Sequence, residues 1–444
     1  MKFTLSWLKE HLDTDASLTE ITDRLTAIGL ELEGVENPAE ALADFVVAEI
    51  VECGQHPDAD KLRLCKVDDG SGEPKPVVCG APNAAKGLKG VFAPVGTYVP
   101  GLDFTLKAAK IRGVESFGML CAEDELGLGE SHDGIIELPA DAPVGAAYPA
   151  YAGLDDPVID VAITPNRQDC MGVRGIARDL AAAGLGTLRP LSDVYRMGAP
   201  VAGEGAGPDV RTDDAAGCPA FYAQEVRGLT NGTAPDWMAR KLTAIGQKPI
   251  STLVDITNFV MIDLGRPLHV YDKAKLSGWL VARRARAGEE VVALNGKTYQ
   301  LTPDMTVIAD DAAVHDIGGI MGGEHSGVSD GTTDVIIECA YFAPESIART
   351  GQALGLTSDA RQRFERGVDP AFLDEGLAIA TWLVTEHCGG QASGVTRAGT
   401  PPVVTKDIAY DPALCGSLGG IAVDEGEQRS ILERLGFAVS DDWQ

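Results

Sequence analysis

Isolated polar side chains within apolar runs mark the stretch from Cys218 to Thr396 as the part of the chain where chemistry is concentrated. Glu338 is the one carboxylate in the strand-like run Val335–Phe342, and His269 stands in the block Gly265–Asp272. Both side chains can exchange hydrogen bonds with a bound ligand. On residue type alone, Glu338 is more often the structural partner of an arginine and His269 a structural hydrogen bonder, so these alternatives stay open.

Three further blocks accompany them. The run Leu253–Met261 is helix-like and carries Thr257 and Asn258. The run Ile317–Glu324 holds four glycines, which suit a backbone that closely approaches a ligand. The polar loop Gly355–Ala360 closes the set.

Carboxylates and histidines also gather between Asp310 and His325, so a metal-dependent hydrolase is one alternative function. These residue types can bind metal, but no two histidines have helical spacing, and the intervening glycines indicate a loop. We therefore disfavour this alternative and expect no metal ligand in the chain. The residues concerned are Asp310, Asp311, His315, Asp316, Glu324 and His325.

Neither ATP binding nor a serine-hydrolase mechanism has a signature here. The chain contains no Walker A sequence and no Gly-x-Ser-x-Gly nucleophile elbow. The glycine-rich stretch 198–207 superficially matches nucleotide-binding spacing, but no strand precedes it and Pro208 follows. We interpret this stretch as a flexible linker.

Short alternating β-runs broken by Gly, Pro and Asp fill the segment from Phe45 to Leu128, the pattern of a small closed barrel. Its blocks His-Pro-Asp-Ala-Asp-Lys-Leu (56–62) and Val-Cys-Gly-Ala-Pro-Asn (78–83) closely resemble the OB-fold tRNA-binding module of several aminoacyl-tRNA synthetases. This resemblance implies a tRNA-binding domain over residues 41–151. The candidate tRNA-binding residues are the basic side chains that gather there: Lys86, Lys89, Lys107, Lys110 and Arg112.

Net charge limits the contact that the chain can make with nucleic acid. The chain holds 66 acidic and 37 basic side chains, a formal net charge of −29. Since such a chain repels a polyphosphate at long range, we exclude a non-specific nucleic-acid binder. Contact with tRNA must come from local basic clusters, from a partner subunit or from sequence beyond Gln444.

Helical pieces flank the barrel on both sides. A capping box at Ser17–Glu20 begins a helix that ends at Gly29, and a helix after the barrel ends at Gly184. Each piece is too small for a core of its own. We therefore expect residues 1–40 with 152–190 to form one discontinuous α/β domain into which the barrel is inserted.

The predicted fold class is α+β multidomain, with roughly three domains of about 150 residues. Besides the inserted OB-fold β-barrel and the small discontinuous domain, residues 208–399 are predicted to form a mixed α/β domain. Residues 400–444, with a capping box at Asp424–Glu427, are predicted to start a further small α/β domain.

Cysteine spacing and hydropathy bear on location. Nine cysteines are scattered without a Cys-x-x-Cys pair, which indicates reduced thiols. No apolar run approaches the ~20 residues needed to span a bilayer, and the start lacks a signal-peptide core. We expect a cytoplasmic protein without membrane contact.

Taken in order and behind an inserted barrel, the blocks from Leu253 to Pro370 closely resemble the beta subunit of bacterial phenylalanyl-tRNA synthetase. The resemblance covers essentially the whole chain and implies that the chain is a fragment, because the family continues into a synthetase-like domain and a basic anticodon-binding domain. It implies tRNA binding and hydrolytic editing of Tyr-tRNA(Phe) by the 208–399 domain.

In the complete family enzyme, two alpha and two beta subunits charge tRNA(Phe) with phenylalanine, using ATP and Mg²⁺. The fragment itself is expected to hold no cofactor. An alternative of a different class is a non-enzymatic tRNA-binding or assembly module with an inactive editing fold, which a deacylation assay would distinguish.

The resemblance also assigns residue roles. Glu338 would receive the tyrosine phenol, and His269 would lie near the ester, where Thr257 and Asn258 line the pocket. A pocket built for Phe cannot strongly reject an added hydroxyl, so a second sieve is useful. No protein nucleophile is evident, which favours hydrolysis by water with help from the substrate's ribose hydroxyl. The other substrate-binding positions are Gly322, Ser358 and Ala360.

The chain departs from the family pattern at one place. After Ala360 the family commonly has a small residue followed by His or Tyr, whereas this chain has Arg361 and Gln362.

Overall fold

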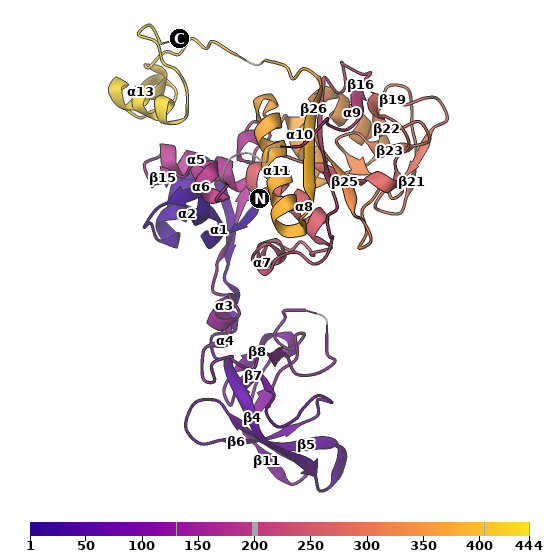
Figure 1. Ribbon diagram of the computed structural model, residues 1–444. Helices are drawn as coiled ribbons and strands as arrows, with labels where there is room; N and C mark the ends of the chain where they lie inside the picture. The colour runs from indigo at the N-terminus through magenta and orange to yellow at the C-terminus, as the bar shows by residue number, and fades with distance from the viewer. Residues whose placement is uncertain (130, 198–202, 404, 444) are drawn as a thin grey trace. The chain divides into compact units, whose positions relative to one another are not determined.

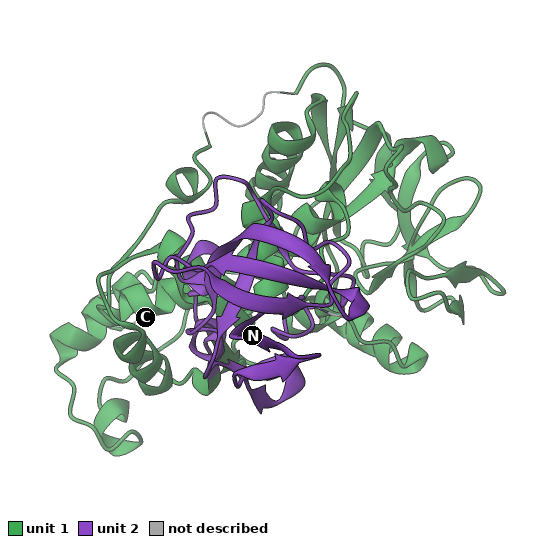
Figure 2. Cartoon of the chain, turned by 90° about the horizontal axis from the view of Figure 1, so that it is seen from below, with its two compact units in different colours: residues 1–34, 159–444 green, residues 35–158 purple. Residues whose placement is uncertain are grey.

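The computed structural model describes residues 1–129, 131–197, 203–403 and 405–443. The chain divides into two compact units: residues 35–158 form one, and residues 1–34 together with 159–444 form the other (Figure 2). The smaller unit is therefore inserted into the sequence of the larger one. None of the helices in the described ranges has both the length and the apolarity needed to span a membrane.

The inserted unit is built on an antiparallel sheet with the strand order β12-β7-β4-β5-β6, and β13 also pairs with β7. A register shift at Ile50/Glu52 marks a bulge in β4, which bends the strand. Beside β12, Phe117 N donates a 2.9 Å hydrogen bond to Pro76 O on β6, so the two edges of the sheet approach each other. The strands are β4 (Val46–His56), β5 (Ala59–Asp68), β6 (Lys75–Cys79), β7 (Lys89–Pro94), β12 (Gly118–Leu120) and β13 (Glu137–Leu138).

Two hairpins and two short helices accompany this sheet. The turn between β10 and β11 places Arg112 and Gly113 at φ values of 48° and 87°, the left-handed conformations that a tight hairpin turn requires. The elements are α3 (Pro38–Ala41), β8 (Tyr98–Val99), β9 (Phe104–Thr105), β10 (Ala109–Ile111), β11 (Val114–Ser116) and α4 (Tyr148–Tyr151).

Short elements at the start of the larger unit surround the small sheet β1-β14-β3 (Lys2–Thr4, Val158–Ala162 and Glu31–Glu36). The predicted capping box is confirmed at the start of α2 (Leu18–Ala27), where Ser17 N donates to Glu20 Oε2 over 2.8 Å and Glu20 N donates to Ser17 Oγ. The predicted second helix is α5 (Val173–Ala182). Gly29 and Gly184 follow these helices with positive φ, as C-terminal glycines do.

Two sheets form the centre of the larger unit (Figure 1). The first has the order β18-β25-β17-β26, from β17 (Ala220–Arg227), β18 (His269–Asp272), β25 (Asp334–Tyr341) and β26 (Gln391–Gly399). The second has the order β16-β19-β22-β23-β24, from β16 (Val210–Thr212), β19 (Leu280–Arg284), β22 (Thr306–Ala309), β23 (Val314–Ile317) and β24 (Met321–Gly322).

Alternation along β25 decides what each face of the first sheet contacts, because successive side chains of a strand point to opposite faces. Val335, Ile337 and Cys339 share a core with α8 (Thr252–Leu264) and α11 (Leu373–Cys388). Ile336 and Ala340 belong to a core shared with the second sheet. Glu338 lies on this second face.

Asp263 fixes α8 to the start of the chain. Trp7 Nε1 donates to Asp263 Oδ1 over 2.6 Å, and His11 Nε2 lies 2.6 Å from the same oxygen. The Tyr195 hydroxyl donates to the other carboxylate oxygen. All four side chains are buried, so this network sets the position of the helix that carries Thr257 and Asn258.

The remaining described α-helices and β-strands are α1 (Leu5–His11), β2 (Leu12–Asp13), β15 (Thr187–Leu188), α6 (Leu191–Val194), α7 (Asp236–Ala244), β20 (Glu290–Val292), β21 (Thr298–Gln300), α9 (Pro344–Leu354), α10 (Asp359–Arg366), α12 (Leu414–Ser417) and α13 (Glu425–Arg434). The mixed α+β class is confirmed. The strands and helices that the sequence predicted at 253–261 and 335–342 are α8 and β25.

Two local predictions need correction. Residues 203–207 of the expected linker run beside β26, where Glu204 N donates to Ala392 O, while residues 198–202 lie outside the described ranges. At α13 the Asp424 carboxylate accepts from Gly426 N instead of forming a reciprocal box with Glu427. The Asp424 carboxylate thus satisfies the second free N–H of the helix and makes a simple cap.

Candidate functional site

A cavity of about 580 Å³ opens at the edge of the first sheet, beside β18. Its volume lies within the range of roughly 300–1,000 Å³ that is typical of small-ligand sites. All seven residues that the sequence assigned to an editing pocket line this cavity: Thr257, Asn258, His269, Gly322, Glu338, Ser358 and Ala360.

One stripe of α8 forms a wall of the cavity. Val254, Thr257, Asn258 and Met261 follow the i, i+3, i+4, i+7 spacing of one helix face. The Thr257 hydroxyl donates to Val254 O over 2.7 Å, which leaves its lone pairs available as acceptors.

His269 and Glu338 are direct cross-strand partners in the β18–β25 ladder, so their side chains emerge from the same face. The His269 ring packs edge-on against Tyr271 at 4.6 Å between centroids, and its Nε2 lies 3.6 Å from Asp316 Oδ1. A Cβ on Gly322 would stand 2.5 Å from His269 Cε1. Gly322 therefore makes room for the imidazole ring.

Glu338 is buried and hydrogen-bonded through one oxygen. The Tyr271 hydroxyl lies 2.5 Å from Glu338 Oε2. Burial and, to a smaller extent, the Asp316 carboxylate raise the pKa of Glu338 to about 8, against the opposing effect of the Tyr271 hydrogen bond. Within the described part of the chain Glu338 forms no ion pair with an arginine, and the buried Arg266 donates to the backbone oxygens of Ala340 and Asp369 instead.

Ser358 connects two loops that border the cavity. Its hydroxyl donates to Ile320 O over 2.6 Å and accepts from Arg361 N over 3.0 Å, as the N-cap of α10. Arg361, where the chain departs from the family pattern, bonds to Leu356 O and to Glu365, and so braces the same loop. Ala360 lies in the first turn of α10 and lines the cavity.

Two polar residues of the site were not assigned from the sequence. Tyr271 follows His269 by two positions, so strand alternation alone could have placed both on one face. Asp316 was considered only as a metal ligand, and nothing in the sequence brings β23 against β18. In the structure the Tyr271 hydroxyl bonds to both the Asp316 and Glu338 carboxylates.

The carboxylates and histidines between Asp310 and His325 do not converge on one point. His315 and Asp316 are neighbours in β23 and point to opposite faces. His315 Nε2 lies 2.8 Å from Asp310 Oδ2, and the His315 ring stacks on the exposed His325 ring at 5.9 Å between centroids. Glu324 is exposed, and Asp316 bonds to Tyr271 on the other face. These positions provide no ligand cluster for the metal-dependent alternative.

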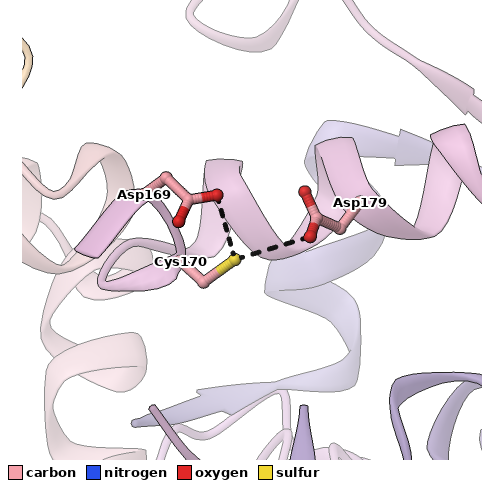
Figure 3. Close-up of side chains that lie close together, drawn as sticks. All are labelled: Asp169, Cys170 and Asp179. Carbon is pink, nitrogen blue, oxygen red and sulfur yellow. Dashed lines mark hydrogen bonds between the residues drawn. The ribbon is translucent and has the colours of Figure 1, made fainter. Parts of the chain in front are cut away.

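Within the described residues, the one group with the spacing of a metal site is Asp169, Cys170 and Asp179 (Figure 3). Both carboxylates are already paired: Arg167 and Arg178 each form ion pairs with Asp169 and with Asp179. Since two guanidinium groups balance the two carboxylates, we interpret the group as an ion-pair cluster.

The predicted tRNA-binding side chains occupy different surroundings in the inserted unit. Lys86, Lys107, Lys110 and Arg112 are exposed. Lys89 is half-buried and donates to Ala142 O over 2.6 Å.

Known protein families match both the part of the chain that holds the cavity and the inserted unit. The B3/4 domain family matches residues 217–389, and the family described as a putative tRNA binding domain matches residues 45–147. A solved N-terminal fragment of the phenylalanyl-tRNA synthetase beta subunit from Pyrococcus horikoshii is 13% identical, and the match covers 63% of this chain and 77% of that one. Its TM-score of 0.30 is too low to show a shared fold.

Curated relatives are far more similar. The phenylalanine–tRNA ligase beta subunit of Novosphingobium aromaticivorans is 61% identical over 100% of this chain and 55% of its own length. That of Zymomonas mobilis is 57% identical over 100% of this chain and 56% of its own length. The resemblance indicated by the motif blocks is therefore confirmed: along its whole length the chain is a homologue of phenylalanine–tRNA ligase beta subunits, and it spans about half the length of the relatives it matches.

Proposed function

We propose that the cavity around Glu338 and His269 is an editing site, which hydrolyses tyrosine wrongly attached to tRNA(Phe). The observation that carries this proposal is a buried carboxylate in the wall of a ligand-sized cavity, directly across the β-ladder from a histidine. The match of the surrounding residues to the B3/4 domain family supports it.

Recognition of tyrosine would depend on Glu338. A Tyr side chain brings a phenol that satisfies the buried acceptor, whereas Phe leaves it unpaired at a cost of about 1–3 kcal/mol. The site would therefore hydrolyse Tyr-tRNA(Phe) in preference to the correct product.

Hydrolysis would use water, because the lining residues include no serine or cysteine with a neighbouring base. Ser358 lines the cavity, but its hydroxyl bonds to backbone groups. His269 has an Nε2 without a hydrogen-bond partner in the described structure, so it can orient a water molecule or the terminal adenosine. Thr257 and Asn258, on the opposing helix, would hold the ester, and Gly322 and Ala360 would admit the aminoacyl group.

For the rest of the protein we propose a phenylalanine–tRNA ligase, in which this chain belongs to the beta subunit, alpha subunits complete a heterotetramer, and ATP and Mg²⁺ serve the aminoacylation site. No residue of this chain is assigned to ATP or Mg²⁺. Residues 41–151 would be an OB-fold tRNA-binding domain, and residues 1–40 with 152–190, 208–399 and 400–444 would be further domains. The expected cytoplasmic location remains a prediction.

Deacylation of Tyr-tRNA(Phe) and Phe-tRNA(Phe) tests the editing proposal. Glu338→Ala should impair Tyr-tRNA hydrolysis and lower the Tyr-over-Phe preference by about tenfold or more, because the buried acceptor is lost. His269→Ala should slow hydrolysis of both substrates without changing that preference. Glu386→Gln, an exposed carboxylate on α11, is the control. Unchanged preference in a folded Glu338→Ala protein would favour a purely structural carboxylate, whereas no deacylation by the wild type would favour the non-enzymatic alternative.

A further inference from the structure

Three buried polar side chains form a hydrogen-bonded chain at the cavity, two of which, Asp316 and Glu338, line it. Tyr271 lies in the middle, and its hydroxyl contacts Asp316 Oδ2 on one side and Glu338 Oε2 on the other. Asp316 Oδ1 accepts from Gly323 N over 3.0 Å. The three residues come from β18, β23 and β25, so the chain spans the gap between the two central sheets.

Counting protons constrains this arrangement. A phenol has a single proton and can donate it to one carboxylate. If both carboxylates were charged, the second would face the lone pairs of the phenol oxygen at hydrogen-bonding distance, which is repulsive. One of the two carboxyl groups must therefore carry a proton and donate it to Tyr271.

Glu338 is the better candidate for that proton. Asp316 already accepts a hydrogen bond from Gly323 N on its second oxygen, whereas the Glu338 carboxyl bonds to Tyr271 alone among the described residues. Burial raises the pKa of Glu338 to about 8, and burial holds Tyr271 protonated by raising its pKa well above the usual range. The other titratable groups that face Glu338 are His269 and the buried thiol of Cys218, whose pKa burial also raises well above its usual value.

We propose that Tyr271 and Asp316 are positioning residues of the cavity, which hold Glu338 as a neutral acid with its proton directed at Tyr271 and its Oε1 presented to the ligand as an acceptor. This inference rests on the proposed editing function. The complete order of donors is ligand phenol to Glu338 Oε1, Glu338 Oε2–H to Tyr271, and Tyr271 O–H to Asp316. Each proton of this hydrogen-bonded series forms one hydrogen bond, and the ligand phenol is the first donor of the series.

The first test reads protonation directly and does not depend on activity. Infrared difference spectra of the wild type against Glu338→Gln should show the C=O stretch of a protonated carboxyl at neutral pH, disappearing as the pH rises through about 8. In Asp316→Asn the band should disappear at a lower pH, because a neighbouring negative charge is gone. Asp330→Asn, an exposed aspartate, is the control. Absence of the band at neutral pH, or an unshifted titration in Asp316→Asn, would overturn the inference.

The second test uses deacylation of both charged tRNAs. Glu338→Gln should rescue most of the Tyr-over-Phe preference that Glu338→Ala loses, because the amide N–H₂ donates to Tyr271 and the amide oxygen accepts from the ligand. Tyr271→Phe should lower the preference by about tenfold, because Glu338 loses the partner that fixes its proton. Tyr151→Phe, in the inserted unit, is the control.

The outcomes separate the two proposals. If Glu338→Gln is as unselective as Glu338→Ala, Glu338 works as an anion and this inference fails while the editing function stands. If Glu338→Ala keeps the preference, the editing role of Glu338 itself fails.

Discussion

At the scale of single residues, the close approach of Gly322 to His269 allows a direct test of whether deacylation depends on the position of the His269 ring. A Cβ at position 322 would stand 2.5 Å from His269 Cε1, closer than a van der Waals contact allows, so Gly322→Ala should displace the imidazole ring. We expect deacylation to slow by about tenfold to a hundredfold with little loss of stability, because the displaced ring can move into the cavity. Gly331→Ala, with no atom within 4 Å of its Cβ, is the control. An unchanged rate would mean that the position of His269 is unimportant.

The raised pKa of Glu338 also predicts how the stability of the folded chain depends on pH. Its pKa is about 8 in the folded chain against an ordinary value of 4.5, so between these pH values the folded state binds a proton that the unfolded state does not. Stability contributed at this site therefore falls as the pH rises from about 4.5 to about 8. Glu338→Gln lacks this loss.

The expected result is that Glu338→Gln raises the unfolding midpoint more at about pH 7.5 than at about pH 5. Thermal unfolding of both proteins across this range measures the difference, with Glu386→Gln as the exposed control. A pH-independent difference would mean that Glu338 has an ordinary pKa.

At the scale of elements, Ser358 and Ser17 are matched N-caps with different surroundings. Ser358 caps α10 and also ties it to Ile320 O beside the cavity, whereas Ser17 caps α2 through a box with Glu20. Replacing either serine by alanine should cost about 1 kcal/mol of stability. Ser358→Ala should also slow deacylation, and Ser17→Ala should not. Equal deacylation rates in the two variants would show that the Ser358 bond to Ile320 does not shape the site.

Elements were also the scale at which the sequence was most informative. Periodicity and caps identified α2, α5, α8 and β25, because those signals are local. The complete hydrogen-bonded chain at Glu338 was not predictable: alternation could place Tyr271 beside His269, but Asp316 bonds to Tyr271 from β23, whose position depends on the pairing of the whole sheet. The sequence pattern at Asp424 does not decide between a box and a simple cap, because a capping side chain can accept from either the second or the third N–H of the helix, and here it accepts from Gly426 N.

At the scale of the whole molecule, the absence of a Walker A signature and of any assigned ATP site predicts that this chain cannot attach phenylalanine to tRNA by itself. The purified chain, supplied with ATP, Mg²⁺, phenylalanine and tRNA(Phe), should form no Phe-tRNA. The control is the same mixture with a complete phenylalanine–tRNA ligase. Detectable product from the chain alone would contradict the proposal that no residue of this chain belongs to the ATP-dependent aminoacylation site.

The balance of charge determines how this chain should bind tRNA. With a formal net charge of −29, long-range repulsion opposes binding, and attraction must come from local groups such as Lys86, Lys107, Lys110 and Arg112. We expect weak binding of tRNA(Phe) that falls steeply with salt, measured by fluorescence anisotropy over a salt series. Each alanine substitution at a contacting cation should lower the slope of log K against log salt by about 0.7–0.9.

Lys89 should contribute less than these four, because one of its N–H groups already donates to Ala142 O. Lys406→Ala, an exposed cation outside the inserted unit, should leave the slope unchanged. Nanomolar affinity that persists at high salt, or equal effects at Lys406 and Lys107, would mean that the inserted unit does not bind tRNA through its basic side chains. In that case the acidic chain would bind tRNA through interactions other than these basic side chains.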